Sequence, residues 1–266
     1  MRAAGVRTVI VQWTETDGER LYPVRHSGAD PLRAILHAAA SRGMEVFLGT
    51  HFLSEWWRRW NDPAFHEVAA ERNATLCRKL AARYGQLPAW RGWYLPFEIG
   101  GWDPDDTETV ALSRWLARLA RDCRRARPGK VLASAFFTRA LPAPALGQVM
   151  GAIFRKSGVD AVLLQTGVGA RSWEAQVRDI VPLYFSAVAR ALGGAGPALW
   201  AVVETFREVP GTGRVPAEAA SVTQQIAAVS EHAERVLIFD FFHYVSPHRG
   251  DAQAVLHRAL FPAGAR

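Results

Sequence analysis

The sequence predicts an α/β protein of the (β/α)8 TIM-barrel type, formed by residues 1–266 as a single domain. Short β-branched runs alternate with amphipathic helical patterns seven times, and strict alternation of this kind produces a parallel sheet with right-handed crossovers. A chain of 266 residues is ordinary for one barrel domain, and no linker or shift in composition divides it. No GxGxxG motif follows the first strand, which favours a barrel over a doubly wound nucleotide-binding sheet.

Seven apolar segments have the length and composition of strands that are buried on both faces of a parallel sheet. In chain order they are residues 6–13 (VRTVIVQW), 44–50 (MEVFLGT), 93–99 (WYLPFEI), 130–137 (KVLASAFF), 160–166 (DAVLLQT), 198–206 (ALWAVVETF) and 235–244 (RVLIFDFFHY).

The segments between these strands carry apolar residues at helical spacing. Asp30-Pro31 and Asp62-Pro63 each supply an N-cap and a first-turn proline, and Gly43 closes the first helix. We expect Pro182 to kink or split the helix that contains it. Inward positions of the successive helices include Leu36, Leu80, Leu116, Met150, Val181 and Ile226, and a last helix is expected over residues 254–260.

The first residues, MRAAGV, have the pattern of a helix end with its C-terminal glycine, running directly into a strand. We therefore expect that the first strand and most of its helix are missing from this chain, which leaves seven βα units. Counted on that assumption, the strand that ends at Glu98 is the fourth and the strand that ends at Glu204 is the seventh.

Composition excludes several classes of protein. The net charge of +7 invites a nucleic-acid partner, but the cations are scattered over amphipathic segments instead of forming one stripe, so no nucleic-acid binding is predicted. No apolar run is long enough to span a membrane, and no signal peptide opens the chain, so periplasmic or extracellular export is expected only if a signal was lost with the missing unit.

Cys77 and Cys123 fall in helical patterns and are interpreted as buried apolar residues. No cofactor or metal site is predicted, because the histidines lack the paired spacing of zinc enzymes. We expect a monomer.

Strand ends predict the site, because chemistry in such barrels sits on residues that end strands or begin βα loops. Two glutamates, Glu98 and Glu204, end strands on opposite sides of the predicted mouth, an arrangement that resembles the large barrel clan of retaining glycosidases. The other strand-end candidates, predicted to bind substrate, are Gln12, Trp13, Glu15, His51, Gln165, Asp240, His243 and Tyr244.

Cleavage of a glycosidic bond requires one protonated carboxyl group and one ionised carboxylate. Glu98 has aromatic neighbours in sequence, which would raise its pKa, so it is assigned as acid/base and Glu204 as nucleophile. The roles could also be exchanged, or an inverting mechanism could use Asp240 or Glu15 as the second acid. That glycosidase clan usually has Asn before the fourth-strand glutamate, whereas this chain has Phe97.

Aromatic residues support a carbohydrate partner. Ten tryptophans are present, and Tyr94, Trp57 and Trp102 are predicted to contact sugar rings, as are the other loop tryptophans Trp56, Trp60 and Trp173. Others, such as Trp115, are interpreted as helix-face core. Arg58 and Arg59 could meet an acidic polysaccharide or simply be solvated.

Together these motifs resemble an uncharacterised bacterial family, a domain of unknown function grouped with the TIM-barrel glycoside hydrolases. The motifs are VIVQW at 9–13, GMEVFLG at 43–49, GWYLPFEI at 92–99, LLQTGVG at 163–169, LWAVVETF at 199–206 and FHYVSP at 242–247. The resemblance implies a glycoside hydrolase acting on a polysaccharide or oligosaccharide, usually exported, and it carries over to Gln12, Trp13, Glu98, Gln165, Glu204, His243 and Tyr244.

Two alternatives stay open. The barrel could bind polysaccharide without cleaving it, with the carboxylates serving structural roles. It could also be a phosphate-binding barrel enzyme, because Gly211-Thr-Gly-Arg214 follows the seventh strand, where such barrels often hold phosphate, although a flexible lid would have the same sequence.

Overall fold

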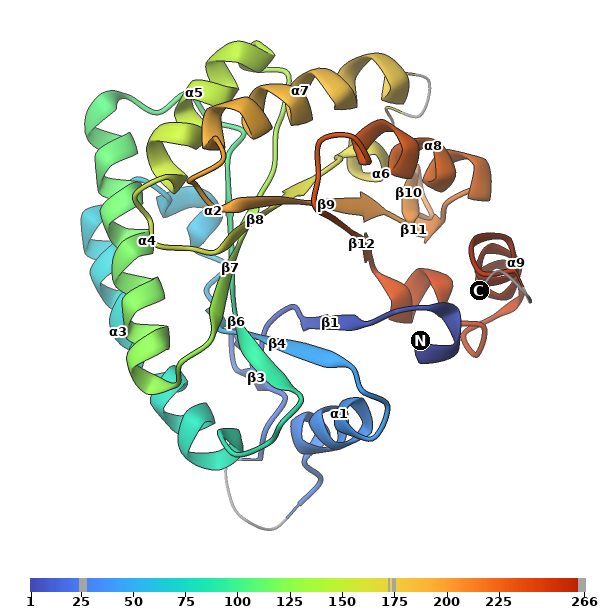
Figure 1. Ribbon diagram of the computed structural model, residues 1–266, viewed down its shortest axis with the longest axis horizontal. Helices are drawn as coiled ribbons and strands as arrows, with labels where there is room; N and C mark the ends of the chain where they lie inside the picture. Colours follow the sequence, from blue (N-terminus) through green and yellow to red (C-terminus); the bar gives the residue numbers. More distant parts are fainter. Residues whose placement is uncertain (24–27, 172, 174–175, 263–266) are drawn as a thin grey trace. The chain divides into compact units, whose positions relative to one another are not determined.

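The computed structural model describes residues 1–23, 28–171, 173 and 176–262, and its main feature is a seven-stranded sheet (Figure 1). The strand order, β1-β4-β6-β7-β8-β9-β12, follows the order of the strands in the chain, as expected from successive right-handed crossovers. The strands are β1 (Thr8–Val11), β4 (Glu45–Gly49), β6 (Trp90–Ile99), β7 (Lys130–Ala135), β8 (Ala161–Gln165), β9 (Ala198–Glu204) and β12 (Arg235–Phe239). All seven predicted strands are therefore confirmed.

Helices occupy the connections between these strands and also follow the last strand, β12. They are α1 (Pro31–Ala40), α2 (Trp56–Arg59), α3 (Pro63–Tyr84), α4 (Asp106–Ala126), α5 (Ala143–Phe154), α6 (Val168–Arg171), α7 (Val177–Leu192), α8 (Ala219–Val229) and α9 (Asp251–Leu260). Pro182 lies inside α7, and the helix continues through it without splitting. Every helix in the described part of the chain is too short or too polar to cross a lipid bilayer.

The alternation of strands and helices is less regular than predicted. A 3-10 turn (Arg2–Ala4) precedes β1. The polar loop that was expected after β1 contains two short strands, β2 (Glu15–Thr16) and β3 (Glu19–Arg20). These two strands form a separate three-stranded sheet with β5 (His51–Phe52). After β9 comes a hairpin of β10 (Phe206–Val209) and β11 (Gly213–Pro216).

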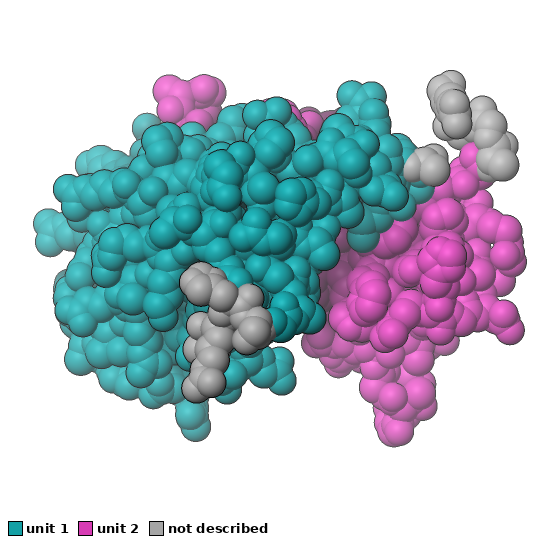
Figure 2. Space-filling view, turned by 90° about the horizontal axis from the view of Figure 1, so that it is seen from below, with its two compact units in different colours: residues 1–98, 104–134, 152–161 teal, residues 99–103, 135–151, 162–266 magenta. Residues whose placement is uncertain are grey.

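The chain divides into two compact units, coloured separately in Figure 2. Unit 1 comprises residues 1–98, 104–134 and 152–161, and unit 2 comprises residues 99–103, 135–151 and 162–266. The boundary passes through β6, β7, α5 and β8, and no composition change marks it in the sequence. That the chain is a single domain stays a prediction.

In unit 1, β1, β4 and β6 pair in parallel, and β4 is buried along most of its length. Helices α3 and α4 pack side by side (Figure 1). Asp62 caps α3 by accepting a hydrogen bond from Ala64 N, and Asp105 and Glu108 form a reciprocal capping box at the start of α4. The free thiols of Cys77 and Cys123 meet between these helices with their Sγ atoms 3.4 Å apart, and both residues are buried as predicted.

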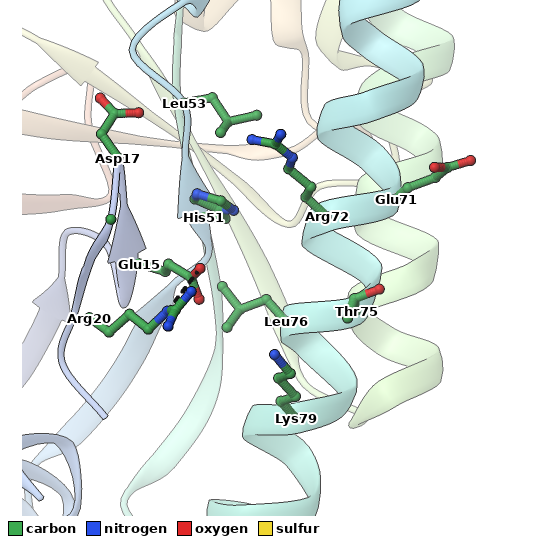
Figure 3. A pocket seen from close by; sticks show the side chains of 11 residues that line it. Glu15, Asp17, Arg20, His51, Leu53, Glu71, Arg72, Thr75, Leu76 and Lys79 are labelled. Carbon is green, nitrogen blue, oxygen red and sulfur yellow. Dashed lines mark ion pairs between the residues drawn. The ribbon is translucent and has the colours of Figure 1, made fainter. Parts of the chain in front are cut away.

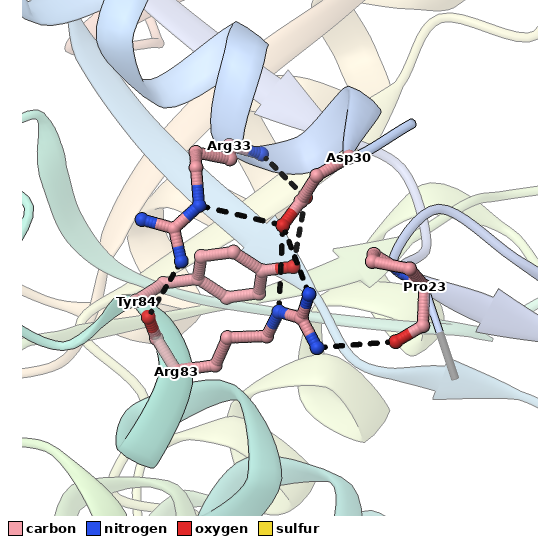
Figure 4. A network of polar contacts seen from close by, with 5 residues as sticks. All are labelled: Pro23, Asp30, Arg33, Arg83 and Tyr84. Carbon is pink, nitrogen blue, oxygen red and sulfur yellow. Dashed lines mark hydrogen bonds and ion pairs between the residues drawn. The ribbon is translucent and has the colours of Figure 1, made fainter. Parts of the chain in front are cut away.

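A polar network centred on Asp30 joins α1 to the end of α3 (Figure 4). Asp30 caps α1 by accepting from Arg33 N at 3.0 Å, and it also accepts from the Tyr84 hydroxyl at 2.9 Å. Arg83 pairs with the same carboxylate at 3.3 Å and donates to the Pro23 carbonyl. Since one carboxylate joins the start of α1 to the end of α3, this network fixes the entry to α1 and keeps Asp30 in a structural role.

In unit 2, β9 and β12 pair in parallel, and α7 packs on α8. The prediction that the last strand reaches residue 244 is wrong, because β12 ends at Phe239 and residues Phe241–Val245 form a π-helical turn, η3. Asp240 caps this turn by accepting a hydrogen bond from His243 N at 2.6 Å, which ends the extended conformation.

Candidate active site

Glu98 lies one residue before the end of β6 and is half-buried. The Trp56 indole donates a hydrogen bond of 3.1 Å to the Glu98 carbonyl oxygen, which ties the end of the strand to α2. Because side chains alternate along a strand, Tyr94 shares the face of Glu98. Burial raises the pKa of Tyr94, a hydrogen bond with Ser134 opposes that shift, and the charge of Glu98 adds to it.

The predicted aromatic surroundings of Glu98 need correction. Phe97 is fully buried and packs against Trp56 and Trp115, with ring centroids 5.4 and 4.9 Å away. Trp93, four residues earlier on the same face, donates to the Arg127 carbonyl at 3.0 Å. Both rings therefore belong to the core beneath α2 and α4, on the face of β6 opposite Glu98. Phe97 occupies a packing position.

Two glycines follow β6 and belong to unit 2. Gly100 and Gly101 have φ angles of 128° and 78°, which only glycine adopts without strain. A Cβ on Gly100 would lie 2.0 Å from the Phe136 carbonyl oxygen, so the close approach also requires glycine. Trp102 then packs edge-on against Phe136 at 5.8 Å and is only half-buried.

Glu204 ends β9 with an exposed fraction of only 2%. Its Oε2 accepts a hydrogen bond from Ala170 N at 2.8 Å, and the backbone N–H of Gly169 also contributes. Burial raises the pKa of Glu204, while these two hydrogen bonds and the charges of Arg171 and Arg214 oppose the shift. The structure thus holds a buried carboxyl group at a strand end, in one orientation.

Two residues that the sequence did not point to, Gly169 and Gln225, help to hold Glu204 in place. We call the α6 backbone and the Gln225 side chain around Glu204 its cradle. A Cβ on Gly169 would lie 2.0 Å from the Phe206 carbonyl oxygen, so this position in α6 requires glycine. Gln225, fully buried on α8, accepts from Glu204 N at 3.1 Å and donates to Glu204 O at 3.0 Å. Its Oε1 also accepts from Thr166 Oγ1 at 2.6 Å. The sequence does carry one signal for Gln225: a polar residue at helical spacing on the same buried face as Val222 and Val229.

The remaining unit 2 candidates lie at the ends of β8 and β12. Gln165 ends β8 and is half-buried. Asp240 Oδ2 lies 2.8 Å from His243 Nδ1, which forms an Asp–His pair on the π-helical turn. Tyr244 packs against Phe206 with ring centroids 5.3 Å apart. Burial raises the pKa of the Tyr244 hydroxyl, and the charge of Asp240 raises it further.

The glycine-rich segment after β9 is the tip of the β10–β11 hairpin. Gly211 and Gly213 have positive φ angles of 75° and 86°, so they serve the turn. Arg214 pairs with Glu208 at 3.1 Å and lies over the Phe206 ring at 4.6 Å. The segment therefore has a structural explanation, and phosphate binding stays an untested alternative.

Unit 1 holds an aromatic cluster formed by Trp13, Phe52 and Trp57. Trp13 stacks on Phe52 at 6.1 Å, and Trp57, which is 47% exposed, meets the edge of Phe52 at 6.4 Å. Gln12, next to this cluster in sequence, is half-buried. The expectation for Trp56 is wrong, since it is fully buried and stacks on Trp115 at 5.2 Å. Arg59 is held by Glu55 and Asp62 at 3.1 and 2.7 Å.

Glu15 and His51 face a cleft of about 660 Å³ between the three-stranded sheet and α3 (Figure 3). They are direct partners on β2 and β5. Burial would raise the pKa of Glu15, but hydrogen bonds from Tyr22 and Arg20 outweigh it and lower the pKa. Burial lowers the pKa of His51, Glu15 works against this shift, and Arg72 adds to it.

No three His, Cys, Asp or Glu residues in the described part of the chain gather as a metal-ligand group.

Comparisons with known proteins agree with this fold. The model of the family DUF4434, a domain of unknown function, matches residues 1–251, whereas no curated protein sequence matches the chain. The crystal structure of a candidate alpha-L-fucosidase from Bacteroides thetaiotaomicron superposes with a TM-score of 0.78 at 18% identity, covering 98% of this chain and 84% of that one.

Two further structures share the fold at lower similarity. Cellulose synthase subunit Z from Clostridioides difficile has a TM-score of 0.63 at 13% identity and covers 97% of this chain and 89% of its own. A GH5_18 protein from Bifidobacterium longum subsp. infantis has a TM-score of 0.55 at 15% identity and covers 97% and 66%. The chain therefore has a glycoside hydrolase-like fold.

Proposed function

This chain belongs to the DUF4434 family, and we propose that it is a glycoside hydrolase that cleaves a polysaccharide or oligosaccharide with two carboxyl groups. The observation that carries the proposal is the placement of Glu98 and Glu204 at the carboxyl ends of the parallel strands β6 and β9. In (β/α)8 barrels the reacting groups stand at strand ends of this kind, and the strand order here is the sequential order of such a barrel.

The proposed roles are acid/base for Glu98 and nucleophile for Glu204. A half-buried Glu98 can exchange its proton with solvent between the two steps of a retaining mechanism. The Glu204 carboxylate is held by the Ala170 N–H on Oε2, and positioning of a nucleophile in one orientation lowers the barrier to attack. The charges of Arg171 and Arg214 favour its ionised form against burial.

One observation favours the exchanged roles. Burial raises the pKa of Glu204, and a raised pKa is what a general acid needs. Azide separates the two assignments, because it can replace the missing group in an alanine variant. If Glu204 is the nucleophile, Glu204→Ala with azide yields a glycosyl azide of inverted anomeric configuration; if it is the acid/base, the azide product keeps the configuration.

Hydrolysis assays test the proposal itself. Wild type is incubated with a panel of neutral and acidic polysaccharides, and product anomers are followed by NMR. Glu98→Gln and Glu204→Gln are expected to reduce glycan release by at least about a thousandfold, as loss of a group that acts as a unit with its partner usually does. Glu231→Gln, on an exposed glutamate, is the matched control. Unchanged release in either catalytic variant contradicts the assignment.

The exposure of Trp57 favours a second candidate, a protein that binds polysaccharide without cleaving it. A tryptophan that is 47% exposed beside Phe52 offers a flat face for a sugar ring. In that case wild type binds a glycan of the panel without releasing product, and Trp57→Ala weakens binding while Glu98→Gln and Glu204→Gln do not.

A further inference from the structure

The cleft between α3 and the β2–β3–β5 sheet has the size and lining of a ligand site. Its volume is about 660 Å³. Leu53 and Leu76 lie behind this lining, and each is only 3% exposed. Arg72, Thr75 and Lys79 also line it, and their spacing along α3 places them on one helix face.

Two cations of this cleft have no carboxylate partner in the described part of the chain. Arg72 and Lys79 make no ion pair within the described residues, although both are exposed. Figure 3 shows their charged ends extending from α3 toward the sheet, while the Glu71 carboxylate points away from the cleft. Arg72 and Lys79 therefore leave a local positive charge facing the cleft.

Of the acidic residues that line the cleft, Glu15 already has partners. Glu15 pairs with Arg20 at 3.1 Å and accepts a hydrogen bond from the Tyr22 hydroxyl. Asp17 lies at the hairpin end of the cleft, where it accepts from Ser54 N at 3.4 Å. Because Arg20 neutralises Glu15, the charges left to a ligand are those of Arg72 and Lys79 on α3 and, at the hairpin end of the cleft, that of Asp17.

This cleft lies on a different face of β5 from the aromatic cluster. His51 lines the cleft, and its backbone is held by Asn73 of α3, which accepts from His51 N at 3.0 Å and donates to His51 O at 3.2 Å. Phe52, the next residue, packs against Trp13 and Phe97. The cleft is thus a separate site that neither the Glu98 nor the Glu204 assignment uses.

We propose that the cleft binds a carboxylate-bearing sugar residue of an acidic oligosaccharide, with the carboxylate between Arg72 and Lys79. Guanidinium and ammonium groups form charge-assisted hydrogen bonds with a carboxylate. The choice of a sugar as the carrier rests on the proposed function, whereas recognition of the carboxylate does not.

Binding measurements on the full chain test this proposal. The probes are a galacturonic acid trisaccharide, its neutral galactose counterpart and sodium sulfate, each titrated calorimetrically at low and at physiological salt. The variants are the double substitution Arg72→Gln/Lys79→Gln and the control Arg114→Gln/Lys156→Gln, which removes the same charge from exposed sites on α4 and near β8. Glu204→Gln is included because the catalytic proposal, and not this one, depends on that residue.

We expect the acidic trisaccharide to bind wild type, the control and Glu204→Gln alike. The cleft variant should bind it at least about tenfold more weakly, with a smaller dependence on salt, as follows from loss of charged contacts. Equal binding by the cleft variant, equal binding of the neutral trisaccharide, or sulfate binding as tightly as the trisaccharide would overturn the proposal. If glycan cleavage is never observed but these shifts are, the cleft proposal stands and the hydrolase proposal fails.

Discussion

Glu98 and Glu204 both lie at the carboxyl ends of strands of the main sheet, but their surroundings differ. Glu204 is almost fully buried, its carboxylate accepts from the α6 backbone, and Gln225 binds both its N–H and its carbonyl. Glu98 is half-buried, and Trp56 holds its backbone carbonyl. Several elements thus determine the conformation of Glu204, whereas Glu98 keeps contact with solvent. This difference is the one expected between a fixed group and a group that exchanges protons.

The largest effect is expected from Gly169→Ala. The new Cβ would lie 2.0 Å from the Phe206 carbonyl oxygen and 3.3 Å from Glu204 Oε2, so α6 must move and the cradle of Glu204 must open. We expect a loss of about 3 kcal/mol or more in the free energy of unfolding, measured by urea denaturation. Gly194→Ala is the control, because a Cβ there meets nothing within 4 Å. A difference between the two variants below about 0.5 kcal/mol would show that the cradle is not rigid.

Gln225→Met removes the hydrogen bonds that hold the backbone of Glu204 while keeping the shape of the side chain. It leaves buried polar groups without partners, so the free energy of unfolding should fall by about 2 kcal/mol. Gln224→Met, its less buried neighbour on α8, should change stability by less than about 0.5 kcal/mol. If both substitutions lower the free energy of unfolding equally, the hydrogen bonds of Gln225 to the Glu204 backbone do not stabilise the fold.

Trp56→Phe tests the weaker anchoring of Glu98. The substitution removes the indole donor to the Glu98 carbonyl and leaves a small cavity beside Trp115. A loss of about 1–2 kcal/mol is expected from the lost hydrogen bond and packing, again by urea denaturation. Trp57→Phe, on an exposed ring, serves as the control and should be nearly neutral. If Trp56→Phe lowers the free energy of unfolding more than Gln225→Met does, the end of β6 is held more firmly than the end of β9.

The smallest expected effect is a pH dependence of stability that arises from Glu204. Because its folded pKa is raised above the ordinary glutamate value of 4.5, the folded state binds more protons than the unfolded state between these two values. The free energy of unfolding therefore falls as pH rises through that window. Wild type and Glu204→Gln are compared by urea denaturation from pH 4 upward. The variant should lack this decline, and parallel curves would mean that the folded pKa is not raised.

Much of the fold followed from the sequence. The seven β-branched runs between amphipathic segments located every strand of the main sheet, because a buried parallel strand needs a continuous apolar run. The strand-end positions of Glu98 and Glu204 followed from the same pattern. The π-helical turn at 241–245 was missed, since FDFFHY has a strand composition and only the side chain of Asp240, accepting from the His243 backbone, ends the strand.

The sequence by itself determined which residues end strands, since local apolar pattern and flanking glycines specify strand length. Only the tertiary structure decided what those residues meet. Gly169 and Gln225 reach Glu204 from segments 35 and 21 positions away, and the pairing of β2 with β5 turns Glu15 and His51 toward α3. Such contacts depend on backbone approach and strand register across the fold, and a single sequence carries no local signal for either.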